Sequence, residues 1–408
     1  MFASSILLLA ALVAAVPSPP LVRVRESKVT VPFVGRLNIT GHTIAEIDRA
    51  RAAQSRAKGK ARIGQSEKRQ SAFPIINEAV TYVATVGVGS PATSYDLLID
   101  TGSSNTWVGA GKRFVETSTS QDTGDLVSVQ YGSGFFIGEE FSDTVTLAEG
   151  LVIENQGIGD ALISQGFDGV DGILGIGPTD LTEGTVDGID SVPTVTDNLF
   201  SQGIIPEKVV GVFFAPTNSL EIANGELSFG QADASKITSD VVFTPITSTS
   251  PASEFFGIDQ SITYGSDGTV VLPSTAGIVD TGTTLFLLPT DAFNTYTTLT
   301  GATMDNNVGL LSLTPENFAN LQSLFFNIGG SAFEFTPNAQ LWPRALNTAI
   351  GGPANGIFLI VSDLGTNSGE GFDFVNGFAF LERFYSIFDS TNNQVGFAAT
   401  AHTMDETN

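Results

Sequence analysis

One short phrase occurs twice in this chain of 408 residues. The segments Leu97–Ser103 and Ala276–Thr283 each place an apolar run before Asp-Thr-Gly and end on a hydroxyl residue. Their aspartates, Asp100 and Asp280, are 180 positions apart in the sequence. A repeat at that distance predicts a chain built from two related lobes, each of which contributes one carboxyl group.

A third Asp-Thr-Gly serves as a control for this interpretation. Asp122–Gly124 follows the polar run Ser118–Gln121 and precedes another acid, Asp125. Because no apolar strand leads into it, we expect a solvated surface turn. The tripeptide alone is therefore weak evidence, and the apolar flanks carry the signal.

The repeated phrase has a chemical logic. An apolar strand buries the carboxyl group, and Gly102 or Gly282 permits a tight turn with close approach of backbone N–H groups. Ser103 or Thr283 can donate a hydrogen bond to the carboxylate. Two such carboxyl groups meeting between lobes would share one proton, since adjacent like charges are costly. The ionised member can then take a proton from water while the protonated member polarises a carbonyl group.

Composition excludes several other chemistries. The chain has no cysteine, which rules out disulfides and thiolate chemistry, and its two histidines, His42 and His402, lie near opposite ends. This argues against Ser-His-Asp hydrolysis and against histidine-ligated zinc. Short alternating runs at 82–86, 95–99 and 241–246 predict strands, and helices are expected near 194–201, 291–299 and 315–321. The phrase Gly87–Ala92 is interpreted as a hairpin turn, because a strand and not a helix follows it.

Charge divides the chain into two unlike parts. The net charge of the chain is −25. Residues 1–69 contain 12 Lys and Arg and 4 Asp and Glu, whereas residues 70–408 contain 6 Lys and Arg and 39 Asp and Glu. Residues 1–15 read as a signal peptide and 16–69 as a basic propeptide ending in the dibasic pair Lys68-Arg69. We expect the stretch Arg49–Arg62 to lie against an acidic cleft as an electrostatic latch. The acidic remainder makes nucleic acid an improbable partner, and no lipid-anchor signal ends the chain.

Over residues 75–400 the sequence resembles the pepsin family of aspartic proteases, in particular the cysteine-free polyporopepsin-type enzymes of wood-rotting fungi. Seven segments carry the resemblance in the family's order: Asp100–Val108, Tyr131–Gly134, Asp171–Gly175, Asp280–Thr284, Phe374–Gly377, Phe384–Asp389 and Val395–Phe397. The chain departs from the family at Phe378, where many members have Asp, and this departure concerns the tuning of pH.

The resemblance implies a role for each matching residue. Asp100 and Asp280 form the catalytic pair, supported by six neighbours: Thr101, Gly102, Ser103, Thr281, Gly282 and Thr283. Tyr131, Gly132 and Ser133 form a flap whose tyrosine hydroxyl lies near the indole N–H of Trp107. Leu98 and Leu174 form an apolar subsite, and Thr284 lines the opposite wall.

The resemblance also implies a mainly β, bilobal pepsin-like fold, with two six-stranded-barrel-type lobes at 70–247 and 248–408 and an active-site cleft between them. The expected protein is a monomeric, secreted, extracellular endopeptidase without cofactor, metal or membrane anchor. Its partners are protein and peptide substrates and its own propeptide as intramolecular inhibitor.

Two other functions compete with this reading. A non-catalytic binding protein on the same fold usually lacks a residue of the pair or flap, and none is missing here. A glycosidase with paired carboxylates predicts two acids in unlike contexts, whereas these two lie in near-identical phrases.

Overall fold

The structure is a computed structural model that describes residues 24–25, 29–37, 42–64, 80–132 and 134–406. The expected signal peptide, the Lys68-Arg69 pair and Ser133 of the flap lie outside the described residues. None of the helices in the described ranges is long and apolar enough to cross a membrane.

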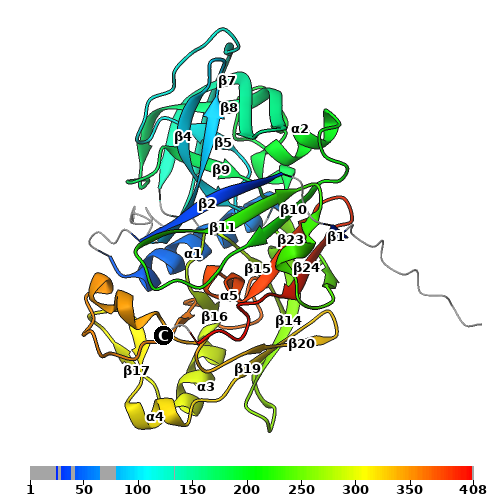
Figure 1. Cartoon of the computed structure of the whole chain (residues 1–408). Coiled ribbons are helices and arrows are strands. Elements are labelled where there is room, and N and C mark those ends of the chain that lie inside the picture. Colours follow the sequence, from blue (N-terminus) through cyan, green and yellow to red (C-terminus); the bar gives the residue numbers. More distant parts are fainter. Residues whose placement is uncertain (1–23, 26–28, 38–41, 65–79, 133, 407–408) are drawn as a thin grey trace, which may run out of the picture.

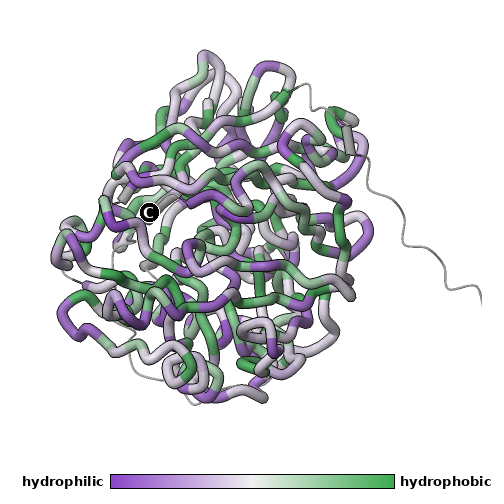
Figure 2. The backbone as a smooth tube through the Cα atoms, turned by 60° about the horizontal axis from the view of Figure 1, so that its bottom comes forward, coloured by the Kyte–Doolittle hydropathy of each residue, from purple (hydrophilic) through white to green (hydrophobic). Residues whose placement is uncertain are grey.

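The protein is mainly β and consists of two lobes with a basic helix between them (Figure 1). Hydrophobic stretches are spread along the chain through both lobes, alternating with hydrophilic ones (Figure 2). This distribution suits many short strands that each bury one face. Strand β7 is an example, since its side chains alternate between buried and partly exposed over most of its length.

The N-terminal lobe is built on the strand that ends at Asp100. Its elements are β3 (Val80–Val88), β4 (Thr93–Asp100), β5 (Thr106–Val108), β6 (Gln121–Gln130), β7 (Phe135–Ala148), β8 (Leu151–Gln165), β9 (Gly172–Gly175) and α2 (Val195–Ser201). The strands run in the order β3-β4-β9-β5-β8-β7-β6, with β4 and β9 parallel. Helix α2 begins at a capping box, in which Thr194 and Asp197 exchange side-chain and backbone hydrogen bonds.

The C-terminal lobe repeats the central part of this arrangement. Its elements are β14 (Gly257–Tyr264), β15 (Thr269–Val279), β16 (Phe286–Leu288), α3 (Thr290–Thr300), β17 (Thr303–Asp305), β18 (Leu310–Ser312), α4 (Pro315–Ala319), β19 (Leu324–Ile328), β20 (Ser331–Phe335), β21 (Val361–Asp363), β22 (Val375–Asn376) and α5 (Phe378–Leu381). The main sheet has the order β20-β19-β14-β15-β22-β16-β21, and β17 pairs with β18 separately. Thus β14-β15-β22-β16 corresponds to β3-β4-β9-β5.

Strands from distant parts of the chain join the lobes. They are β10 (Val209–Phe213), β11 (Glu221–Phe229), β13 (Val242–Pro245), β23 (Phe384–Asp389) and β24 (Gln394–Ala399). They extend the N-terminal sheet in the order β13-β24-β23-β10-β11, and β2 (Thr30–Leu37) lies between β11 and β3. A short parallel pair, β1 (Val24–Arg25) with β12 (Ala232–Asp233), lies apart. The segment predicted to be a propeptide thus supplies a strand to the sheet.

Helix α1 (Ile44–Arg62) follows β2 and lies between the two lobes (Figure 1). It begins at a capping box, in which the Thr43 side chain accepts from Glu46 N and the Glu46 side chain accepts from Thr43 N. Basic residues in its last turn, Lys60 and Arg62, suit the negative end of the helix dipole.

The local predictions from the sequence agree with these elements. Strands β3 and β4 and helix α3 contain the expected runs, whereas β13, α2 and α4 lie within the expected ranges and are shorter by one or two residues. A turn joins β3 to β4. Asp122–Gly124 is exposed, as predicted, but it lies at an irregularity within β6 and not in a plain turn. Gly124 has a φ of 79°, and its N–H donates to the Asp122 carboxylate, so an extra loop of backbone fits inside the strand.

Candidate active site

Two equivalent strands deliver the two aspartates to the boundary between the lobes. Strand β4 ends at Asp100, and β15 ends one residue before Asp280. Each strand lies beside a parallel neighbour, β9 or β22, so that Ile99 pairs with Leu174 and Val279 pairs with Asn376. Because hydrogen bonds hold each of these strands to a neighbour on both sides, the turn that follows the strand has little freedom to move.

The same hydrogen bonds hold both carboxyl groups. Gly102 N donates to Asp100 Oδ1 at 2.8 Å, and the Ser103 hydroxyl donates to Asp100 Oδ2 at 2.5 Å. In the other lobe Gly282 N donates to Asp280 Oδ1 at 3.1 Å and the Thr283 hydroxyl to Oδ2 at 2.6 Å. Asp100 and Asp280 are 0% and 1% exposed, so water does not screen their charges.

A reciprocal pair of hydrogen bonds joins the two turns. Thr101 N donates to Thr281 Oγ1, and Thr281 N donates to Thr101 Oγ1, both at 3.0 Å. Each hydroxyl also donates to the opposite strand, Thr101 to Val279 O at 3.4 Å and Thr281 to Ile99 O at 3.2 Å. Thr101 and Thr281, two of the expected supporting neighbours, therefore cross-link the two turns.

One guanidinium group from α1 contacts both carboxylates. Arg51 Nη2 lies 2.5 Å from Asp100 Oδ1, and Arg51 Nε lies 2.8 Å from Asp280 Oδ2. The Arg51 side chain is only 5% exposed. Because a guanidinium is a rigid planar fork, this contact requires that the two carboxyl groups face one another at short range.

The two carboxyl groups differ in proton affinity. Burial raises the pKa of Asp100, and the charge of Asp280 adds to this effect, although the Arg51 guanidinium opposes it. Burial also acts to raise the pKa of Asp280, but the charge and hydrogen bond of Arg51 outweigh it and hold the value below its ordinary range. Two facing carboxyls with different proton affinities can divide the roles of acid and base between them.

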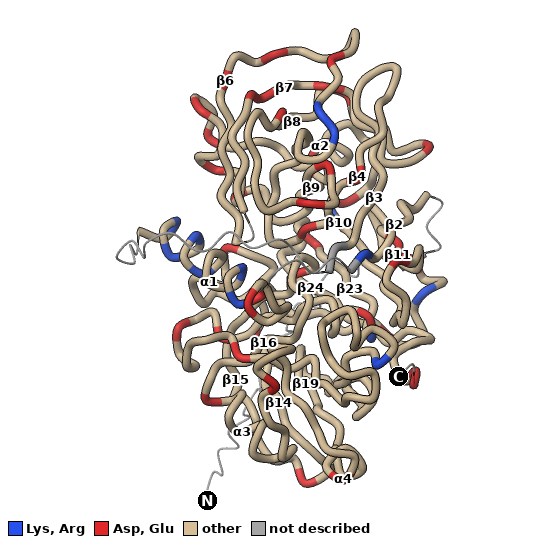
Figure 3. The backbone as a smooth tube through the Cα atoms, turned by 90° about the vertical axis from the view of Figure 1, so that its left-hand side faces the viewer, with Lys and Arg blue, Asp and Glu red and all other residues tan. Residues whose placement is uncertain are grey.

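Further contacts fix α1 in the cleft. Both oxygens of Asp48 accept backbone N–H groups of the C-terminal lobe, from Thr284 at 3.1 Å and Leu285 at 2.7 Å. Lys60 pairs with Glu370 at 2.9 Å, and the guanidinium of Arg62 contacts carboxylates of both lobes. Figure 3 shows Lys and Arg gathered on α1, while Asp and Glu are spread over the lobes. The basic side chains of α1 thus pair with acids of both lobes.

The expected flap is a hairpin between β6 and β7. Tyr131 N donates to Gly134 O at 2.7 Å and closes its tip. A Cβ atom on Gly132 would overlap the Arg51 backbone, so the hairpin lies directly on α1. The rings of Tyr131 and Trp107 are 6.3 Å apart. Burial raises the pKa of Tyr131, and a hydrogen bond with the Trp107 side chain opposes this rise. The two side chains are therefore neighbours.

The two residues of the predicted apolar subsite lie in different hydrophobic clusters. Leu98 packs in a cluster with Trp107 and Tyr131, but Leu174 belongs to the main core of the protein. The residue of β9 that shares the Leu98 cluster is Ile173, which is paired with Leu98 across the sheet. Successive side chains of a strand point to opposite faces, so a shift of one residue moves a side chain from cleft to core.

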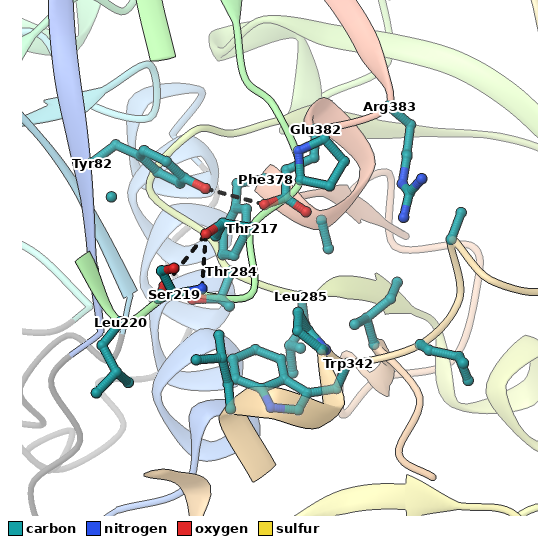
Figure 4. A pocket seen from close by; sticks show the side chains of 18 of the residues that line it. Tyr82, Thr217, Ser219, Leu220, Thr284, Leu285, Trp342, Phe378, Glu382 and Arg383 are labelled. Atoms are coloured by element: carbon teal, nitrogen blue, oxygen red, sulfur yellow. Dashed lines mark hydrogen bonds between the residues drawn. The ribbon is translucent and has the colours of Figure 1, made fainter. Parts of the chain in front are cut away.

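A cavity adjoins the C-terminal wall of the site (Figure 4). Thr284 and Leu285 lie on its wall, together with Phe378, whose ring centroid is 5.1 Å from that of Tyr82. Tyr82 donates to the buried Glu382 at 3.4 Å, and burial raises the pKa of Glu382 to about 8. At the position where many relatives have Asp, this chain therefore has an aromatic contact.

Sequence reasoning missed three residues of the site. It placed the latch on Arg49–Arg62 without identifying Arg51 as the group between the carboxylates, and it overlooked Asp48 and Ile173. The capping pattern from Thr43 to Glu46 was a usable sign that a helix begins there. Neither Arg51 nor Asp48 has a local pattern that points to the dyad.

Within the described residues, no group of three or more Asp, Glu or His side chains is arranged to hold a metal ion. The family model described as eukaryotic aspartyl protease matches residues 81–400. The chain is 61% identical to polyporopepsin of Irpex lacteus over 337 residues, which cover 82% of this chain and 98% of that protein. It is 30% identical to rhizopuspepsin-1 of Rhizopus niveus over 98% of both chains.

A crystal structure of an aspartic proteinase from Irpex lacteus matches the fold with a TM-score of 0.78 and 62% sequence identity. The match covers 80% of this chain and 96% of that one. With two buried carboxyl groups facing one another between two related lobes, the chain belongs to the eukaryotic aspartyl protease family and is an aspartic-type endopeptidase of the pepsin fold.

Proposed function

We propose that this protein is the secreted proenzyme of an acid endopeptidase in which Asp100 and Asp280 activate a water molecule. The observation that carries the proposal is the contact of one guanidinium with both carboxylates. A site that accepts one cation between two acids can, after that cation leaves, hold one proton and one water in its place. The ionised carboxylate then removes a proton from water, and the protonated one donates to the substrate carbonyl oxygen.

Residues on both sides of the dyad support binding of an extended peptide. The backbone N–H groups of Thr284 and Leu285, which Asp48 engages in this structure, are donors that a substrate carbonyl oxygen could use instead. The Leu98, Ile173 and Tyr131 cluster lies beside the flap and is apolar. These features favour large hydrophobic side chains at the cleaved bond, and cleavage after Lys should be rare.

The propeptide acts as an intramolecular inhibitor in this proposal. Helix α1 lies against the flap at Gly132, and Arg51 bonds to both carboxylates, where the proposal puts the catalytic water and proton. Removal of residues up to about Lys68-Arg69 would expose the dyad. Export through the predicted signal peptide would deliver this proenzyme to the outside of the cell.

The test is proteolysis of a denatured protein between pH 3 and pH 7, with and without pepstatin, the family's inhibitor that resembles the transition state. We expect cleavage in acid that pepstatin stops, with cut sites flanked by large hydrophobic residues. Absence of pepstatin-sensitive cleavage after removal of the propeptide would contradict the proposed chemistry. Frequent cleavage after Lys would contradict only the proposed specificity.

A further inference from the structure

A pair of amide side chains is buried in the C-terminal lobe near Asp280. Gln260 Nε2 donates to Asn376 Oδ1 at 3.1 Å, and Asn376 Nδ2 donates to Gln260 Oε1 at 2.9 Å. The two residues are 1% and 0% exposed. A reciprocal amide pair satisfies in each partner the groups that burial would otherwise leave unpaired.

The two amides come from the strands on either side of the strand that delivers Asp280. Gln260 lies on β14, which pairs antiparallel with β15, and Asn376 lies on β22, which pairs parallel with β15. The backbone of Asn376 touches the dyad turn directly, because Asp280 N donates to Asn376 O at 3.1 Å. The amide pair therefore links Asn376, which accepts the Asp280 N–H, to β14 on the other side of β15.

The N-terminal lobe has an apolar pair at the equivalent positions. Asn376 pairs with Val279 as Leu174 pairs with Ile99, and Gln260 pairs with Thr275 as Val86 pairs with Tyr95. Val86 and Leu174 are both fully buried in the main core. The fold can thus close behind a catalytic aspartate with apolar side chains, and the amides behind Asp280 are not required by the architecture.

We propose that Gln260 and Asn376 are a positioning pair that fixes where the Asp280 turn lies relative to Asp100. Amide hydrogen bonds are directional and lose partners on a small shift, whereas apolar contacts tolerate sliding. The coupling between two facing carboxyls depends on their separation, so the pair acts on how the dyad shares its proton. This inference rests on the proposed role of the dyad.

The test uses the full chain activated in acid, with the N-terminal arrangement imported as Gln260→Val/Asn376→Leu. Replacing both partners of a buried hydrogen bond by apolar groups need not destabilise the fold. We expect a folded enzyme whose kcat is lower by between about tenfold and a hundredfold, with KM little changed. We also expect a displaced limb in the pH profile of kcat/KM. A folded double variant with wild-type kcat and pH profile overturns the inference.

Two further variants keep the test decisive. Gln340→Leu removes another fully buried amide of the same lobe, which bonds to Tyr296 and Gln322, and should lower stability without displacing the pH profile. If the double variant does not fold, Gln260→Glu decides. A neutral glutamic acid still bonds to Asn376, so activity near pH 3 should be retained. Burial raises the pKa of this carboxyl group, and activity should fall once the pH is high enough to ionise it. Circular dichroism should stay native over this range. An unchanged pH dependence in this variant overturns the inference.

The two proposals fail in different ways. If the wild-type enzyme shows no pepstatin-sensitive cleavage, the proposed function fails. If the wild-type enzyme cleaves in acid and the variants at Gln260 and Asn376 behave like the Gln340→Leu control, only the positioning role fails.

Discussion

The turn that carries Asp100 and the turn that carries Asp280 have nearly the same local structure but different surroundings. Each carboxylate accepts one glycine N–H and one hydroxyl, and each strand has a parallel neighbour. The settings differ in that the flap covers the N-terminal side, whereas Arg51 makes two contacts with Asp280 and one with Asp100. The repeated phrase thus provides two equivalent carboxyls, and their surroundings make them unequal.

The strongest way to break the comparison is to remove one carboxylate charge. We expect Asp100→Asn and Asp280→Asn each to lower kcat by a factor of between about a hundred and ten thousand. The reason is that an amide can neither accept nor supply the transferred proton. The measurement is peptide hydrolysis at pH 3 to 4 by each folded variant. Asp122→Asn, at the exposed Asp-Thr-Gly, should keep wild-type activity. Full activity in either dyad variant is incompatible with the mechanism.

The next effect concerns the cation that the two turns share. Arg51→Ala in the proenzyme removes the cation between two buried carboxylates, although each keeps its glycine N–H and hydroxyl donors. We expect a loss of about 3 kcal/mol in the free energy of unfolding at pH 7. The variant should also become active at a higher pH than the wild type. Denaturant unfolding and the pH of activation measure these changes.

Lys60→Ala is the matched control for Arg51→Ala. Its ion pair with Glu370 involves a carboxylate that is half exposed, so the loss should stay within about 1 kcal/mol. Equal losses in the two variants would mean that contact with the dyad contributes nothing special.

The pH dependence of stability should separate the proenzyme from the mature enzyme. Arg51 overcomes burial and lowers the pKa of Asp280, so this contribution to helix docking is present above about pH 4 and is lost as pH falls below that value. A mature form that begins after Arg69 would lack this cation and keep 6 Lys and Arg against 39 Asp and Glu. Its acids repel one another, and the raised pKa of Asp100 favours protonation, so it should be most stable in acid.

We therefore expect the gap between the two unfolding midpoints to widen from pH 3 to pH 8. Asp48 works against this trend, because burial raises its pKa to about 7 and docking of its charged form becomes costly as pH rises through that value. A mature form as stable at pH 8 as at pH 4 would contradict the charge argument.

The smallest expected effect sharpens the symmetry itself. Thr101→Val and Thr281→Val each remove one acceptor of the reciprocal pair and leave a buried N–H unpaired, at a cost of about 1–3 kcal/mol. Because the two bonds have the same length, thermal unfolding should show similar losses for both variants. A large difference between them would show that the turns are not equivalent even in their backbone.

Much of the local structure follows from short-range pattern. The alternation at 82–86 and 95–99 is reproduced in β3 and β4, and the helix predicted near 194–201 is α2. The apolar residues before Asp100 and Asp280 distinguish these two aspartates from Asp122, because an apolar run before a carboxyl group predicts the buried end of a strand. Such signals need only neighbours in sequence, which is why they are readable without a structure.

The sequence alone determined the repeat, the two acids with their hydroxyl partners, and the change of charge near residue 69. The tertiary structure decided which side chains meet across long separations. Arg51 is 49 residues from Asp100 and 229 from Asp280, and Gln260 is 116 from Asn376. It also decided that Ile173 and not Leu174 joins Leu98. Sheet register and helix docking fix these contacts, and both depend on the packing of the whole chain.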